Sequence, residues 1–298
     1  MKIGFAKTLR NHYVYLLMIA PALIGFSIFF ILPTLMNFGY SLTNWSVYKP
    51  NYSFIGLKNF VELVHDVQTT AAVKNAFIYA IVMTLLQNIL AIPLAVALSL
   101  KLKSANLLKT VFFAPAILSV LIVGYLWSFI MTSADHGLLN QLVQFFGFGP
   151  INWLGNPKLA LFSVLFTQLW QWTGWAMVIY LANIQSIDET LYEAAKIDGA
   201  NAVQRFFKVT LPLLYPSVSF NVLMSMIGGL KVFDIIFSMT SGGPGYSTET
   251  ITTMLIRRGF TEGRTAYAAA FGVVFFLLVL IVSKAITWSF NKWEEKIS

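Results

Sequence analysis

Residues 186–212 read SIDETLYEAAKIDGANAVQRFFKVTLP and form the most informative stretch of this 298-residue chain. Ser186, with Glu189 three residues later, predicts a capping box and therefore the start of a helix. Gly199 suits the left-handed backbone conformation that often ends a helix. Asn201, with a glutamine three residues later, predicts a second helix start. The stretch therefore predicts two short helices joined by a tight turn.

Both predicted helices carry a face suited to contact with another surface. On the first helix, a low-profile face with helical spacing contains Leu191, Ala194, Ala195 and Asp198. On the second, an apolar face contains Val203, Phe206, Phe207 and Val209. Such a hairpin would either dock in a groove of a partner protein or lie passively on a lipid surface. Periodicity alone leaves both alternatives open.

The composition of the whole chain indicates whether water or lipid surrounds it. Hydrophobic residues make up 57%, charged residues 11%, and the mean hydropathy is +0.72. Soluble chains carry about 25% charged residues. This chain therefore has too little charge to cover a water-soluble globule, which excludes a soluble enzyme, a disordered chain and a coiled coil. We expect an integral membrane protein.

Charge, cysteine and histidine usage exclude several other classes of function. The net charge of +8 comes from basic residues spread over short loops, so no nucleic-acid-binding face is expected. The chain has no cysteine, which excludes disulfides and thiolate metal sites. Its three histidines are scattered without the spacing of metal ligands. We expect neither a bound metal nor another cofactor in this chain.

The apolar residues are grouped in six segments long enough to cross a bilayer, which needs roughly 20 residues. These segments are 14–36, 75–100, 110–134, 159–187, 211–230 and 266–290. Lys284, near the end of the sixth, is the one charged residue inside them. Pro212 is expected in the first turn of the fifth segment. The fold class predicted is an all-α integral membrane protein with six transmembrane helices.

The distribution of basic residues predicts the orientation of these spans. With a cytoplasmic N-terminus, the inner segments hold 11 basic residues in about 55 positions, and the outer ones hold 8 in about 100. The inner set includes Lys2, Lys7, Arg10, Lys101 and Lys196. Both termini are therefore expected on the cytoplasmic side.

Catalytic motifs are missing from the sequence. It contains no G-x-x-x-x-G-K-[ST] phosphate loop, no H-E-x-x-H and no G-x-S-x-G. All 12 acidic residues map to loops or span ends. The chain is therefore not expected to be an enzyme, and no catalytic residue is assigned. A secondary transporter would need a protonatable or ion-coordinating group within its spans, and none is visible. An intramembrane enzyme or a scaffold is the remaining rival.

Polar and small residues inside two spans mark a candidate solute pathway, because a polar side chain that faces lipid is costly. In the fourth span, one helical face contains Gln168, Gln171, Trp172 and Trp175. In the fifth, the same spacing relates Ser225, Gly228, Gly229 and Val232. Amides hydrogen-bond to hydroxyl groups, and flat indoles cover the apolar face of a sugar ring. The alternative is that these glycines and tryptophans serve helix packing.

The charge of the pathway limits the solute. Lys231 and Asp234 lie near the proposed pathway and are expected to pair at i and i+3. An anionic solute would need uncompensated Arg or Lys. An uncharged mono- or oligosaccharide is therefore expected. Gln87 and Asn88 of the second span are as well suited to bridging helices and are not assigned to the pathway.

Three motifs resemble those of bacterial ABC-importer permeases. Glu193-Ala-Ala-x-x-Asp198-Gly199-Ala200, then Phe206 and Leu211-Pro212, is similar to the EAA loop of that family. Phe233-Asp234, Thr240-x-Gly242-Gly243-Pro244 and Thr248-Glu249-Thr250 resemble the branch of the maltose, lactose and glycerol-3-phosphate type. The segment 54–60, FIGLKNF, is also similar to that branch. The resemblance covers nearly the whole chain.

The resemblance implies a type I ABC-importer permease fold that forms a single permease domain, 1–298, with a core at 75–290. Residues 186–211 would form the coupling loop, which sits in a groove of a cytosolic ATPase. The residues that it assigns to this coupling are Glu193, Ala194, Ala195, Asp198, Gly199, Ala200 and Phe206. The eight pathway positions named above also resemble sugar-lining positions of maltose-type permeases.

The resemblance also implies the partners and the location. The chain would pair with a second homologous permease and with two ATPase subunits, which bind ATP and Mg, and an external solute-binding protein would deliver the substrate. The assembly would lie in a bacterial cytoplasmic membrane and import an uncharged sugar. Another small polar solute such as glycerol phosphate is the alternative.

Overall fold

A computed structural model describes residues 15, 17–49, 51–100, 103–133 and 137–297. The described residues are largely helical, and their β-structure consists of two isolated bridges, Thr43 with Phe54 and Ser46 with Lys49. The chain divides into two compact units. Unit 1 comprises Met1–Val64 and Ile256–Phe275, and unit 2 comprises His65–Leu255 and Phe276–Ser298.

Unit 1 joins an apolar helix near the N-terminus to a segment of turns and short helices. A helix runs through Leu17–Ser41. It contains a π-helical turn, η1 (Ser27–Ile31), and ends with α2 (Leu32–Ser41). The other helices are α3 (Lys58–His65), the π-helical turn η3 (Arg257–Thr261) and the first part of α15 (Thr265–Ile297). The Asn59 amide donates to the carbonyls of Ser41 and Thr43, each at 2.8 Å. This buried amide holds the turn after α2.

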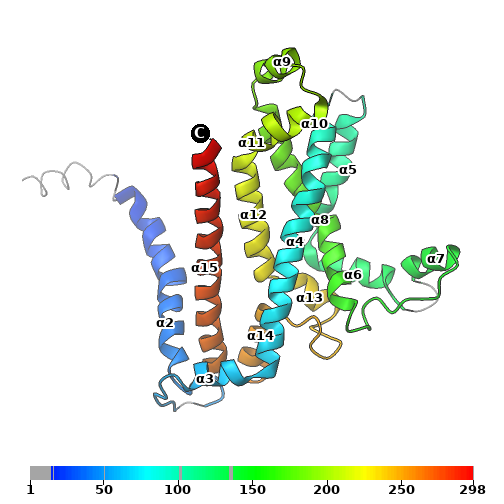
Figure 1. Cartoon of the computed structure of the whole chain (residues 1–298). Coiled ribbons are helices and arrows are strands. Elements are labelled where there is room, and N and C mark those ends of the chain that lie inside the picture. Colours follow the sequence, from blue (N-terminus) through cyan, green and yellow to red (C-terminus); the bar gives the residue numbers. More distant parts are fainter. Residues whose placement is uncertain (1–14, 16, 50, 101–102, 134–136, 298) are drawn as a thin grey trace, which may run out of the picture. The chain divides into compact units, whose positions relative to one another are not determined.

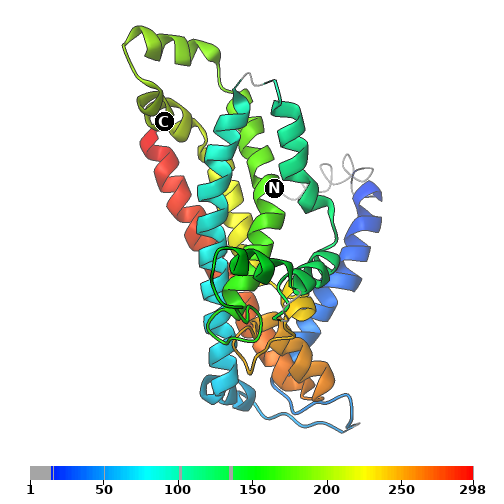
Figure 2. The same ribbon diagram turned by 90° about the vertical axis from the view of Figure 1, so that its right-hand side faces the viewer.

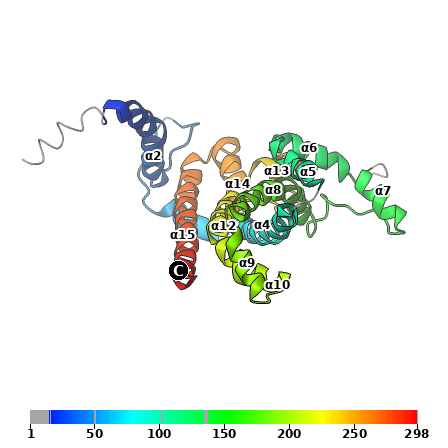
Figure 3. The same ribbon diagram turned by 90° about the horizontal axis from the view of Figure 1, so that it is seen from above.

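Unit 2 contains the bundle that carries the candidate sites. Its helices are α4 (Val67–Ser99), α5 (Ala105–Ile117), α6 (Val120–Ile130), α7 (Leu138–Phe145), α8 (Ala160–Gln185), α9 (Glu189–Ile197), α10 (Ala202–Arg205), η2 (Phe206–Thr210), α11 (Leu211–Leu213), α12 (Tyr215–Leu230), α13 (Asp234–Met239), α14 (Ile251–Ile256) and the rest of α15. Helix α4 packs against α8 and α12, and α13 packs against α6. The end-on view shows α4, α8 and α12 grouped together and α7 projecting away from them (Figure 3).

Small residues let α4 approach its neighbours closely. Ala72, Ala76 and Ala80 recur every four residues on α4, and each is fully buried. A Cβ atom at Gly229 of α12 would lie 2.6 Å from the Cα of Ala80, so the two backbones are in contact. In a membrane, packing of this kind replaces the hydrophobic effect as the source of helix association. The α4–α12 crossing therefore requires glycine at position 229.

Length and composition mark three to five candidate membrane spans in the part of the chain that the structure describes. Three helices in the described part of the chain are long and apolar enough to cross a membrane, Leu17–Ser41, Val67–Ser99 and Thr265–Trp293. Two bent pairs raise the number to five if each pair is one span. Helix α8, Ala160–Gln185, is 26 residues long but carries several polar side chains. The six-span count therefore stays a prediction.

The third predicted span, 110–134, is wrong as a single helix. The structure breaks it into α5 and α6, which are bent by 99°. Pro115 lies in the last turn of α5, and the chain leaves the helical conformation at Leu118 and Ser119. Proline often kinks a helix, and the break here goes further and separates two helices.

The fifth predicted span begins later than expected. Residues 202–213 form one continuous helical segment, which meets α12 at an angle of 68°. Pro212 therefore lies at the end of the segment 202–213, and Pro216 occupies the first turn of α12. The prediction that Pro212 opens the span is wrong, because the chain turns at Leu214.

The predicted hairpin is confirmed, with one corrected cap. Helices α9 and α10 lie at one end of the α4–α8–α12 group and α13 lies toward the other, and the hairpin extends past α8 (Figures 1 and 2). Asn201 and Gln204 form the expected capping box, with hydrogen bonds of 2.9 and 2.8 Å. Ser186 instead ends α8, and its hydroxyl donates to the Asn183 carbonyl.

The first hairpin helix is capped by Asp188, whose carboxylate accepts from the backbone amide of Thr190 at 3.0 Å. This hydrogen bond holds the pKa of Asp188 below its usual value. The cap is therefore fully present at neutral pH and is lost as the pH falls through the lowered pKa. At the other end, Gly199 has φ of +79°, and the Ala200 amide donates to the Ala195 carbonyl in a Schellman motif.

Some predicted features lie outside the described residues. They are the start of the first span at Val14, the end of the third at Ala134, and the basic residues Lys2, Lys7, Arg10 and Lys101.

The corrected cap yields a test with a matched control. Asp188→Ala should make the amides of the first turn of α9 exchange severalfold faster in hydrogen–deuterium exchange, because the cap of the helix is lost. Ser186→Ala, two residues away, should leave α9 protection unchanged. Equal effects of the two substitutions would contradict the assignment of Asp188 as the cap.

Candidate functional site

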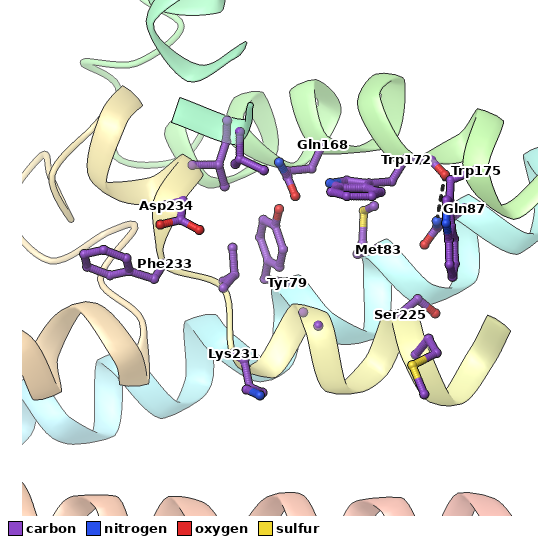
Figure 4. Close-up of a pocket in the computed structure, with 16 residues that line it drawn as sticks. Tyr79, Met83, Gln87, Gln168, Trp172, Trp175, Ser225, Lys231, Phe233 and Asp234 are labelled. Carbon is purple, nitrogen blue, oxygen red and sulfur yellow. Dashed lines mark hydrogen bonds between the residues drawn. The ribbon is translucent and has the colours of Figure 1, made fainter. Parts of the chain in front are cut away.

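A cavity of about 320 Å³ lies in unit 2 between α4, α8, α12 and the segment that leads into α13 (Figure 4). Its walls combine aromatic rings, side-chain amides and exposed backbone. The lining residues are Tyr79, Met83, Gln87, Val120, Gln168, Trp172, Trp175, Met224, Ser225, Gly228, Gly229, Lys231, Val232, Phe233, Asp234 and Ile235. The mixture of flat apolar surface and neutral polar groups is suited to a solute with both kinds of surface.

The structure brings most of the predicted pathway residues into this cavity. The ones that line it are Gln168, Trp172, Trp175, Ser225, Gly228, Gly229 and Val232. Gln171 is the exception, since its side chain is fully buried beside α6 and does not line the cavity. Whether the lining residues touch a solute stays a prediction.

The aromatic wall is held in place by packing and by one amide. The rings of Trp172 and Trp175 lie edge to face with centroids 6.4 Å apart. The Gln87 side chain donates to the Trp172 carbonyl at 3.0 Å, which links α4 to α8 at the cavity (Figure 4). Gln87 thus bridges two helices, as one of the sequence interpretations held, and also lines the cavity.

Helix α4 supplies lining residues that sequence reasoning missed. Tyr79, Met83 and Gln87 recur every four residues and face the cavity together. This spacing was the available signal, but tyrosine and methionine are common in apolar spans and did not stand out. Val120, Met224 and Ile235 carry no polar group that would have marked them.

The two adjacent glycines of α12 have different surroundings. A Cβ atom at Gly229 would meet the backbone of Ala80, whereas a Cβ atom at Gly228 would meet nothing within 4 Å. Both residues line the cavity. Gly229 therefore serves helix packing, and Gly228 leaves open space in the cavity. The packing interpretation is confirmed for Gly229, and the solute-lining interpretation of Gly228 stays a prediction.

The charged residues at the cavity do not form the expected pair. Both Lys231 and Asp234 are exposed, and within the described residues they make no ion pair with each other. Figure 4 shows their charged groups pointing to different sides. The predicted i, i+3 pairing is wrong because the helix ends at Leu230 and α13 starts at Asp234, so no helical register connects them. Among the described residues, no cluster of three His, Cys, Asp or Glu side chains is arranged to hold a metal.

The hairpin presents its predicted coupling residues on the surface of the chain. Glu193, Ala194, Asp198 and Gly199 are exposed, and Ala195, Ala200 and Phe206 are half-buried. Within the described residues, Glu193 makes no ion pair. The Tyr192 hydroxyl is 3.0 Å from the Thr210 hydroxyl, which connects α9 to the returning segment. This contact thus stabilises the hairpin from within, while four of its seven predicted coupling residues are exposed.

Comparisons with known proteins identify the type of chain. Residues 69–293 match the model of the binding-protein-dependent transport system inner membrane component family. The chain is 36% identical over 278 residues to the probable ABC transporter permease protein YurN of Bacillus subtilis, covering 92% of this chain and 94% of that protein. It is 33% identical over 264 residues to the trehalose/maltose transport system permease protein MalF of Thermococcus litoralis, covering 89% of each.

A solved structure shows the same fold. A bacterial ABC transporter involved in the import of the acidic polysaccharide alginate contains a chain with a TM-score of 0.84 and 23% sequence identity, covering 97% of this chain and 99% of that one. The fold is therefore that of a type I importer permease, as the motifs predicted. Together with the family match and the relatives, the fold shows that this chain belongs to the inner membrane components of binding-protein-dependent transport systems and is an ABC transporter permease.

Proposed function

We propose that this chain forms half of the translocation pathway of an ATP-driven importer for an uncharged sugar or oligosaccharide. The observation that carries the proposal is the cavity lined by amides, indoles and open backbone in the middle of the bundle. Sugar hydroxyls need neutral donors and acceptors, and sugar rings stack on flat aromatic faces. The similarity to the trehalose/maltose transport system permease of Thermococcus litoralis supports the same class of solute.

The partners proposed are those of a complete importer. A second, homologous permease would close the other side of the cavity, and an external solute-binding protein would deliver the sugar. Two cytosolic ATPase subunits would bind ATP and Mg and carry out all hydrolysis. The exposed hairpin, with Glu193 and Gly199 at its surface, supports docking in an ATPase groove rather than a passive position on lipid. Lipid surrounds the remaining apolar surface.

The proposed setting is the cytoplasmic membrane of a bacterium, with both termini in the cytoplasm. The hairpin then lies inside the cell, where the ATPases are. The chain works as a single permease domain over residues 1–298, and the core at 75–290 carries both the cavity and the coupling segment at 186–211. The family description as an inner membrane component supports this placement.

The proposed function is tested by purification and uptake. The tagged chain should copurify with an ATPase and a second permease, and membranes containing the assembly should take up neutral sugars in an ATP-dependent manner. A secondary transporter would instead move solute without an ATPase. Uptake restricted to glycerol phosphate or other anionic solutes would refute the neutral-sugar assignment and leave the importer assignment intact.

Gly199 offers a test of the coupling hairpin. Gly199→Val should abolish the copurification of the ATPase, because a β-branched residue with positive φ costs about 1–3 kcal/mol and would distort the turn. Gly199→Asn should retain it, because asparagine tolerates the left-handed conformation. Normal ATPase association and uptake in the valine variant would refute the role of the hairpin in coupling.

The adjacent glycines of α12 test the cavity. Gly228→Val should lower uptake at least about tenfold, because valine adds three carbon atoms and a single extra methylene in a pocket already has an effect of that size. Assembly with the partners should persist, since position 228 has open space around it. Gly229→Ala should instead reduce the amount of folded, assembled protein, because the added carbon overlaps the Ala80 backbone. Wild-type uptake by the Gly228 variant would show that the cavity is not the pathway.

A further inference from the structure

The break between α5 and α6 releases a backbone acceptor inside the bundle. Helix α5 ends at Ile117 and α6 begins at Val120, so the Leu118 carbonyl lies at the break. The Gln171 side chain of α8 donates to this carbonyl at 3.0 Å. Since unsatisfied backbone groups are costly in a membrane, this hydrogen bond stabilises the break.

The Leu118 carbonyl also fixes the orientation of two amides. A carbonyl only accepts hydrogen bonds, so Gln171 must present its NH₂ group to Leu118. Its oxygen is then left to accept, and the Gln168 amide nitrogen donates to it at 3.0 Å. The Gln168 oxygen therefore points away from Gln171. Figure 4 shows this oxygen on the side of the Tyr79 hydroxyl.

Tyr79 brings a second polar group to the same place. Its side chain is 1% exposed and lines the cavity, and its hydroxyl has no hydrogen-bond partner. A buried hydroxyl without a partner is costly, and a ligand that supplies the missing hydrogen bond removes that cost. A solute in the cavity that Tyr79 lines would supply that partner.

We propose that the Tyr79 hydroxyl and the Gln168 amide oxygen form a two-point subsite for one hydroxyl group of the solute. Tyr79 donates to the solute oxygen, and the solute O–H donates to Gln168. Gln171 is a positioning residue, since it sets which atom of Gln168 faces the cavity. This inference rests on the proposed transport of a neutral, polyhydroxylated solute.

The subsite selects for a hydroxyl against related groups. A deoxy position leaves both protein groups unpaired, and an O-methyl or anionic oxygen brings lone pairs against the Gln168 oxygen. A site built to hydrogen-bond a hydroxyl discriminates strongly against analogues that lack it, because its own polar groups are then left without partners. Tyr79 and Gln168 are therefore specificity-determining residues.

The test uses the complete importer in membrane vesicles with its binding protein. Labelled maltose, trehalose and raffinose are first offered to the wild type, and single-deoxy and single-O-methyl derivatives of the transported sugar follow. The wild type should prefer the parent sugar over the derivatives altered at one particular position by about tenfold in kcat/KM. Tyr79→Phe should lose this preference at that position alone. The binding protein is the same in both assays, so its own selectivity cancels.

Tyr79→Phe is suited to this test because the hydroxyl makes no hydrogen bond in the folded chain. The variant should be at least as thermally stable as the wild type while it loses discrimination, a combination that a merely structural role would not produce. Gln171→Met should show the same loss of discrimination, because Gln168 is then free to reorient. Tyr125→Phe, at an exposed tyrosine of α6, is the control and should behave as the wild type.

The outcomes separate the subsite from the proposed function. If Tyr79→Phe keeps the full preference at every hydroxyl position, the subsite is refuted and sugar import stands. If the wild-type importer transports only charged solutes, the proposed function fails and the subsite fails with it. If Tyr79→Phe loses the preference and Gln171→Met keeps it, the positioning role of Gln171 is overturned.

Discussion

Polar groups within the bilayer must find partners inside the protein, and this constraint organises unit 2. The Gln171 amide satisfies the carbonyl at the helix break, and the Gln87 amide reaches the Trp172 carbonyl from α4. The Tyr180 hydroxyl bonds to the Asn88 amide oxygen between α4 and α8. These hydrogen bonds tie together helices whose association gains nothing from expelling water. Polar residues in these spans therefore have structural roles before any functional one, and a polar group left without a partner beside the cavity is the one that points to a ligand.

The cavity and the hairpin are connected by the same helices. Helix α8 carries Trp172 and Trp175 on the cavity wall and ends at Gln185, three residues before the cap of α9. The returning segment, 202–213, leads through the turn at Leu214 into α12, which lines the opposite wall. The hairpin is therefore joined at both of its ends to helices that line the cavity. A displacement of the hairpin by a partner would be transmitted along α8 and α12, because a helix resists bending far more than a loop does. Under the proposed function, this is the route by which ATPase closure would reshape the cavity.

Membrane helices, helix caps and tight turns were largely predictable from the sequence, whereas contacts between residues far apart in the chain were not. Composition identified membrane helices, and the Asn201 capping box and the Gly199 turn follow from short-range rules. The prediction that Ser186 caps the first hairpin helix is wrong because Asp188, two residues later, forms the cap. Rules based on short sequence motifs do not decide between two neighbouring candidates for a cap. The α5–α6 break was missed, because the hydrogen bond that satisfies its Leu118 carbonyl comes from Gln171, 53 residues away. Tyr79 was missed because an unpaired hydroxyl is a property of its surroundings and not of its residue type.

The polar and aromatic residues that recur at helical spacing on α8 do not all face the same neighbour. Gln168, Gln171, Trp172 and Trp175 share a face by spacing, yet the structure divides them between the cavity and the α6 contact. A face of about 100° or more is wide enough to meet two neighbours at once. Gln171 meets the helix break, and the other three meet the cavity. The residue that does not line the cavity nevertheless determines its chemistry, because the single carbonyl it satisfies decides whether Gln168 offers a donor or an acceptor. A pattern of polar residues in a span therefore marks where a pathway is built, and only the hydrogen-bond directions show what it selects.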